Sequence, residues 1–342
     1  MSTSVFAREP IQTEEMEISS FLSENNISLS LINELKDVYD TTKSEGNVVI
    51  GNFNDKMIEI KNLAETYNFS KEQIEDYIEG ITSKPPVIVG SPEQTEISVM
   101  EAPKSSRIGD DGIGYEVKSN DGYVKQTAFL TLPSVSITNE KNTSTTATSA
   151  YMFYSYEYGG NAIDIGLWYH YGDGGWGWRD TYLRTFADSS NQTYEGKLNV
   201  SAGDYLYLEA AIVYGNDGQR YIQYLISDGD NLNDVKANVA VWVGNYIGSS
   251  AIIDRQITLC NSANNFNTGE KIEGAIFESA KLFTSVNGNG VSVSSYNTNR
   301  YNRGRFGKFG NDYKQVKVID YVPWYGEAID IFFDATKQNV GE

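Results

Sequence analysis

The chain has little sulfur, little imidazole and little positive charge, and each shortage excludes a class of protein. Its one cysteine, Cys260, has no partner in the chain for a disulfide. Its one histidine, His170, cannot build a zinc cluster, and any Ser-His-Asp triad would depend on it. Only 27 Lys and Arg stand against 46 Asp and Glu, a net charge of −19. This balance argues against nucleic-acid binding and against a cationic membrane-surface helix.

Long apolar runs are also missing. The longest uncharged stretch of apolar character, residues 239–253, contains Asn245 and Gly248 and is shorter than the ~20 apolar residues that a spanning helix needs. We therefore predict no transmembrane segment. Residues 1–18 are polar and acidic and do not resemble a secretory leader, which fits a cytoplasmic chain or one already processed. We expect an extracellular or cell-surface protein, with the cytoplasm left open.

The first hundred residues are the more acidic part and have a helical pattern. They hold 7 basic and 18 acidic residues, a net charge of −11. Apolar residues recur at helical spacing in three runs: Ile18, Phe21 and Leu22; Leu31, Ile32, Leu35, Val38 and Tyr39; Met57, Ile58, Leu63 and Ala64. Ser70 followed by Gln73 is a capping-box pattern. We predict three or four short helices between residues 12 and 82.

After a proline-containing stretch at residues 83–108 the period of the apolar residues changes to two. Gly, Asn and Asp between the runs favour hairpin turns. The predicted strands are 123–132, 150–158, 162–171, 205–214, 221–227, 237–247, 252–260, 273–283 and 316–321. The sequence thus predicts a mainly β fold, an antiparallel two-sheet β-sandwich of jelly-roll or concanavalin A-like type over residues 109–342. An acidic helical region (1–82) and a linker (83–108) precede it.

Aromatic residues gather near the middle of the chain. In the strand at 162–171, alternation places one set of residues on the core face, namely Ile163, Ile165, Leu167 and Tyr169, and another on the opposite face, namely Asp164, Trp168 and His170. A glycine-rich loop then leads to Trp176, Trp178 and Arg179. Sugar rings stack on aromatic faces while their hydroxyls need fixed polar partners. We predict a carbohydrate-binding groove; the alternative is that these aromatics fill the core.

Carboxylates within the strands suggest a second function. Asp164 and Glu273 are candidates for an acid and base pair in polymer cleavage, and Glu157, Glu209 and Glu278 are further carboxylates within apolar runs. The alternative is a solvated outer face of each sheet.

The strands and two short motifs resemble a known superfamily. Over residues 115–290 the chain is similar to the concanavalin A-like sandwiches, and Asp164-Ile165-Gly166 with the later Glu273 resembles the glutamic peptidase branch. That branch uses a Gln in a Gln-Ala-Gly context and a Glu in an Ala-Glu-Trp-Ile context. Here Asp164 stands in place of the Gln, and Glu273-Gly274-Ala275-Ile276 replaces the second motif. The resemblance implies a sandwich fold and a peptide-hydrolysing site.

Three further segments carry candidate sites. An acidic loop suits a single structural Ca²⁺ bound by Asp228, Asp230 and Asp234, with a hairpin turn as the alternative. No other cofactor is predicted.

Residues 296–317 are basic. A candidate anion-binding patch there consists of Arg300, Arg303, Arg305 and Lys308, and the acidic helical region is an alternative partner that would neutralise it. A Ser/Thr-rich run at 131–148 has the alternation of a membrane-inserting toxin hairpin or of a surface loop.

The leading prediction is a non-enzymatic protein that binds a polysaccharide or glycoconjugate surface through the aromatic groove, with self-assembly possible. A polymer-degrading hydrolase and a secreted pore-forming toxin are the alternatives.

Overall fold

A computed structural model describes residues 9–40, 42, 47–89, 111–137, 148–170, 175–185, 191–244, 247–261, 268–303, 316–322 and 326–334. Four helices come first: α1 Glu9–Asn25, α2 Leu29–Val38, α3 Phe53–Tyr67 and α4 Lys71–Ser83. None of the described helices is long and apolar enough to cross a membrane. The predicted capping box opens α4: Ser70 Oγ accepts from the N–H of Gln73, whose side chain accepts from the N–H of Ser70.

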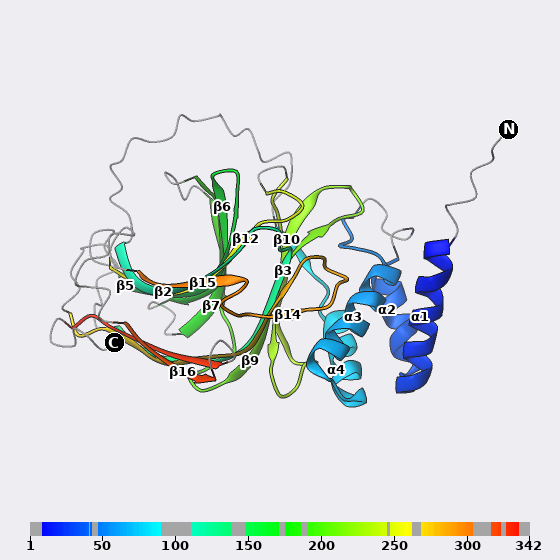
Figure 1. The fold of residues 1–342 in the computed structure, drawn as a ribbon, viewed down its shortest axis with the longest axis horizontal. Coiled ribbons are helices and arrows are strands. Elements are labelled where there is room, and N and C mark those ends of the chain that lie inside the picture. The colour runs from blue at the N-terminus through cyan, green and yellow to red at the C-terminus, as the bar shows by residue number, and fades with distance from the viewer. Residues whose placement is uncertain are drawn as a thin grey trace.

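The strands form two sheets, the large sheet and the small sheet (Figure 1). The ten-stranded large sheet contains β1 Val87–Val89, β3 Lys125–Thr131, β4 Ser134–Ser136, β9 Tyr205–Tyr214, β10 Arg220–Asp228, β11 Val235–Trp242, β13 Lys271–Phe283, β14 Val291–Ser292, β16 Val316–Val322 and β17 Gly326–Phe332. The seven-stranded small sheet contains β2 Asp111–Ser119, β5 Thr148–Tyr158, β6 Asn161–His170, β7 Gly175–Thr185, β8 Asn191–Lys197, β12 Ile252–Asn261 and β15 Thr298–Arg303.

Many strands that lie side by side in the two sheets are far apart in the sequence. The large sheet runs β1-β11-β10-β9-β3-β13-β17-β16, with β4 and β14 on β13, and the small sheet runs β15-β2-β12-β5-β6-β7-β8. Among the described pairs only β1–β11 is parallel. A mainly β, two-sheet sandwich with N-terminal helices is therefore confirmed. All nine predicted strands are present, because each combines β-branched or aromatic residues with a period of two.

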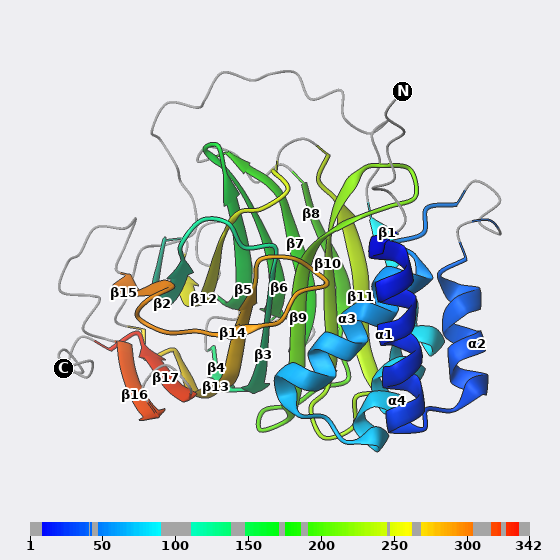
Figure 2. The same ribbon diagram turned by 45° about the vertical axis from the view of Figure 1, so that its right-hand side comes forward.

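The core lies between the two sheets. Side chains that are almost completely buried there include Ile113, Tyr154, Ile165, Leu208, Ile222 and Ile329. The helices pack on the other, outer face of the large sheet (Figure 2), where they form a second core with Phe129, Tyr207, Leu225 and Phe283. Gly80 of α4 packs closely against the backbone of Leu232: a Cβ added to this glycine would lie 2.6 Å from the carbonyl oxygen of Leu232. The helical segment thus shares its apolar core with the sheet.

The predicted linker has one described part, since residues 90–110 lie outside the described ranges. Residues 87–89 form β1, which pairs with Val239–Val241 of β11. The segment directly after α4 therefore adds an edge strand to the large sheet.

Candidate functional site

A row of buried polar side chains crosses the outer face of the small sheet. Asp254 of β12 pairs in register with Ser155 of β5, which pairs with Asp164 of β6. Directly paired residues of an antiparallel ladder point to the same face. The exposed fractions are 0% for Asp254, 3% for Ser155 and 8% for Asp164. Because burying a carboxylate is costly without polar partners, a row of this kind marks a candidate site.

The neighbouring positions add an amide, a further acid and an ion pair. Gln256 donates from Nε2 to Asp254 Oδ2 at 2.5 Å, and it pairs in register with Glu116, which is also buried. Lys118 Nζ lies 2.5 Å from Glu157 Oε2. Burial alone would lower the pKa of Lys118, but the hydrogen bond and charge of Glu157 outweigh it and raise that pKa. The described part of this face thus holds fixed donors and acceptors.

An aromatic platform lies on the same face. Tyr151 of β5 and Trp168 of β6 are paired in register, and their rings are parallel within 8° with centroids 6.2 Å apart. Phe153 meets Tyr151 edge-on at 6.3 Å. All three side chains are half-buried. Trp168 is four residues from Asp164 on the same strand, so ring faces and carboxylate share one surface.

The predicted alternation of β6 is confirmed. Ile163, Ile165 and Leu167 are buried between the sheets, whereas Asp164 and Trp168 belong to the outer face. The side chain of His170 is outside the described set, so its place in a groove stays a prediction.

Trp176 corrects the predicted groove. It is 2% exposed, lies in the core and meets Tyr169 edge-on at 5.4 Å. The reason is the register of β6 and β7, which pairs Trp176 with Tyr169 and so turns both to the inner face. Trp178 pairs with Leu167 and Arg179 with Gly166; neither side chain is described, and their roles remain predictions.

Glu273 is not a partner of Asp164. It belongs to β13 of the large sheet, pairs with Ser134 of β4, and forms an ion pair with Lys271 at 2.5 Å. The predicted Asp164–Glu273 pair is therefore wrong. Asp254 does share the face of Asp164, because alternation within residues 252–260 places it opposite the core residues of that strand.

The acidic loop forms a turn. Asp228 Oδ1 accepts from the backbone N–H groups of Asp230 and Asn231, both at 2.9 Å, and Asp234 forms an ion pair with Lys236 at 2.5 Å. Within the described ranges no three His, Cys, Asp or Glu side chains come together as a metal site. Local backbone groups use Oδ1 of Asp228, as in an ordinary turn, and a structural Ca²⁺ on this loop stays a prediction.

One member of the predicted anion-binding patch is described. Arg300 of β15 forms an ion pair with Glu327 of β17 at 3.2 Å. Glu327 also pairs with Arg255 and accepts from the Tyr115 hydroxyl at 2.6 Å. Thus a sandwich carboxylate, rather than the helical region, faces Arg300. The side chain of Arg303 and all of Arg305 and Lys308 lie outside the described residues, as do 138–147 of the Ser/Thr-rich run.

Comparisons with known proteins give a structural likeness alone. No protein-family model matches the chain, and no curated protein matches it. Among solved structures, scytalido-glutamic peptidase with a transition state analog inhibitor is similar with a TM-score of 0.41 and 10% identity, over 64% of this chain and 97% of that one. SCP-B, an eqolisin-family peptidase in complex with the tripeptide Ala-Ile-His, gives 0.38 and 10% over 64% and 97%. The wider concanavalin A-like relationship stays a prediction.

Proposed function

We propose that the outer face of the small sheet binds a carbohydrate polymer or glycoconjugate surface without chemical change, in an extracellular or cell-surface setting. One observation carries this proposal: the rings of Tyr151 and Trp168 are parallel and half-buried on the same face as Asp164. Flat aromatic faces take up the C–H faces of a sugar ring, and fixed polar groups orient its hydroxyls.

The polar row supports the same function. Ser155, Asp164 and Gln256 belong to strands inside the small sheet, where the ladders on both sides fix their backbones. Preorganised groups lose little conformational entropy on binding. The backbone that carries these polar groups and the neighbouring rings is therefore fixed before any ligand binds.

The test is retention on polysaccharides by affinity electrophoresis, followed by calorimetry on the best ligand. We expect Trp168→Ala and Tyr151→Ala each to weaken binding by about five- to thirtyfold, since loss of one stacked ring removes ~1–2 kcal/mol. Tyr296→Ala is the matched control, because this tyrosine is 93% exposed and lies elsewhere, on the turn before β15. Unchanged retention in folded Trp168→Ala and Tyr151→Ala would exclude this face as the binding site.

A second function has its own supporting observation: Asp164 and Asp254 are buried carboxylates on one face, and Gln256 donates a hydrogen bond to Asp254. They are two strands apart, which puts their backbones about 10 Å from each other. Carboxyl groups separated by about 6.5–9.5 Å suit an acid and base that act through a water molecule. Hydrolysis of a polymer on this face is therefore our second proposal.

Asp164→Asn and Asp254→Asn test it in reducing-sugar and peptide-release assays. Both variants are expected to lose nearly all turnover while keeping binding, because an amide neither donates nor accepts a catalytic proton. Glu157→Gln, which changes an ion-paired carboxylate on the same face, should keep its rate. If wild-type protein binds polymer but releases no product, the binding function alone stands.

A further inference from the structure

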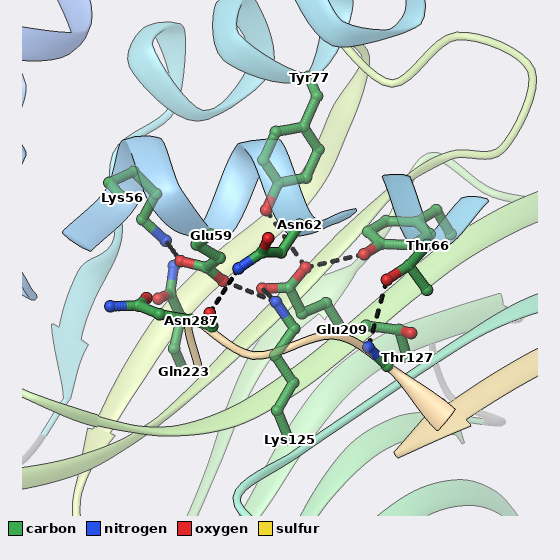
Figure 3. Close-up of polar contacts among 12 residues, drawn as sticks. Lys56, Glu59, Asn62, Thr66, Tyr77, Lys125, Thr127, Glu209, Gln223 and Asn287 are labelled. Carbon is green, nitrogen blue, oxygen red and sulfur yellow. Dashed lines mark hydrogen bonds and ion pairs between the residues drawn. The ribbon is translucent and has the colours of Figure 1, made fainter. Parts of the chain in front are cut away.

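Four charged side chains are buried together between the helices and the large sheet (Figure 3). Lys56 Nζ of α3 lies 2.5 Å from Glu59 Oε2, and Glu59 Oε1 lies 2.7 Å from Lys125 Nζ of β3. Lys125 Nζ in turn lies 3.2 Å from Glu209 Oε1 of β9. None of the four is more than 5% exposed. The chain of ion pairs therefore links α3 to two strands.

Tyrosines from three elements complete this cluster. Tyr77 of α4 and Tyr207 of β9 donate their hydroxyls to Glu209 Oε2 at 3.2 and 2.8 Å. The ring of Tyr39, directly after α2, lies 5.5 Å from Lys56 Nζ. On the remaining side the ring of Phe283 lies 5.0 Å from Lys125 Nζ. Two positive and two negative charges balance in a site without exposed members.

The charges decide how this interface responds to its surroundings. A buried ion-pair network is often no more stabilising than apolar residues of the same volume, but removal of one partner is strongly destabilising. Apolar contacts hold equally well at every pH, whereas paired charges hold only while each remains ionised. An interface that depends on such a network can therefore be opened by protonation.

We propose that residues 9–83, the helical cover, are an acid-releasable cover of the large sheet, and that protonation of Glu59 opens it. Release would uncover Phe129, Tyr207 and Leu225, which now complete the core beneath the helices.

Burial alone would raise the pKa of Glu59, but Lys125 and Lys56 outweigh it and lower that pKa to about 2. A carboxylate whose pKa is lower in the docked state stabilises that state at pH values above its ordinary pKa of 4.5. This contribution is lost as the pH falls towards about 2.

Protonation of Glu209 has the opposite effect on the stability of the docked state. Burial, against the pull of Lys125, raises its pKa, so the docked state accepts this proton first and its own contribution grows as the pH falls. Glu59 remains between the two lysines until the second proton arrives. Two unpaired buried ammonium groups then repel each other and oppose docking. The opening therefore falls between about pH 4.5 and about pH 2.

Hydrogen exchange of the full chain, followed by mass spectrometry from about pH 7 down to about pH 2, tests the proposal. We expect α3 and α4 to lose protection in the acid window while β5, β6 and β12 keep it. Simultaneous loss in helices and strands, or helices protected down to the lowest pH, would overturn the acid-releasable cover.

Variants assign the opening to the network. An apolar replacement of all four charges, Lys56→Met, Glu59→Leu, Lys125→Met and Glu209→Leu, should keep the helices protected until the strands unfold. If its helices open at the wild-type pH, protonation of Glu59 is not the trigger. Glu65→Gln on the same helix, where the carboxylate is half exposed beside Lys61, should leave the opening pH unchanged. Should the apolar variant not fold, Glu59→Gln decides the question: it leaves Lys56 without its carboxylate at every pH, so the helices should lose protection at a higher pH than in the wild type. An unchanged opening pH in this variant would overturn the proposal.

Discussion

On the outer face of the large sheet, Glu59 and Glu209 are buried with two lysines and sealed beneath helices, whereas on the outer face of the small sheet Asp254 and Asp164 share a row with Ser155. The first face pairs its acids with two buried lysines, whereas the second places them among polar groups, with Lys118 in register with Asp254 and half-buried rings on the same face. This difference separates an interface that holds the helices on the large sheet from the face that we propose as a binding site.

The largest effect is expected where charge pairing is most complete. Lys125→Met leaves Glu59 and Glu209 facing each other without their shared cation, and should lower the free energy of unfolding by about 3–5 kcal/mol. Urea denaturation at neutral pH measures it. A loss below about 1 kcal/mol would mean that the helical cover does not depend on the network.

The two tryptophans sharpen the comparison between core and surface. Trp176→Ala empties a site between the sheets and should cost about 3–5 kcal/mol of unfolding free energy. Trp168→Ala should lower the free energy of unfolding by less, because its side chain is half-buried. Of these two variants, only Trp168→Ala should weaken polymer binding. Thermal unfolding and retention are measured on both; equal stability losses would contradict the assignment of Trp168 to the outer face.

A smaller effect is expected at the cap of α4. Ser70→Ala removes the acceptor for the N–H of Gln73 and should lower stability by about 1 kcal/mol. Because the cap is exposed and far from the small sheet, polymer binding should be unchanged. Ser70→Thr, which keeps the hydroxyl, should restore most of the loss in the same urea titration.

The smallest effect concerns Glu273. Glu273→Gln breaks an exposed ion pair with Lys271 and should change stability by no more than about 0.5 kcal/mol. Product release, if wild-type protein shows any, should also be unchanged. A large loss of rate in this variant would restore the carboxylate to the site and refute the role of Asp254.

Much of the fold follows from local pattern. Residues 205–208 alternate tyrosine and leucine at the start of β9, which forms as predicted, and Ser70 with Gln73 begins α4 as predicted. The strands at 175–185 and 298–303 were not predicted, because glycine, asparagine and charged residues interrupt their apolar period. These strands gain their order from neighbours in the small sheet.

The candidate site was predictable only in part. Asp164 and Trp168 were correctly placed on one face, since both positions lie within one strand. Trp176 was not, because the residue opposite it in β6 decides its face. Asp254 was not singled out either, since nearly a hundred residues separate it in sequence from its partner Ser155.

Sequence alone determined where the helices and nine of the strands form and which side chains within each of them share a face, because period and capping act over a few residues. Tertiary structure decided that Asp254 joins Asp164, that Trp176 enters the core and that Lys125 meets Glu59. Each of these depends on the register or packing of distant segments, which is fixed only when whole faces are buried together.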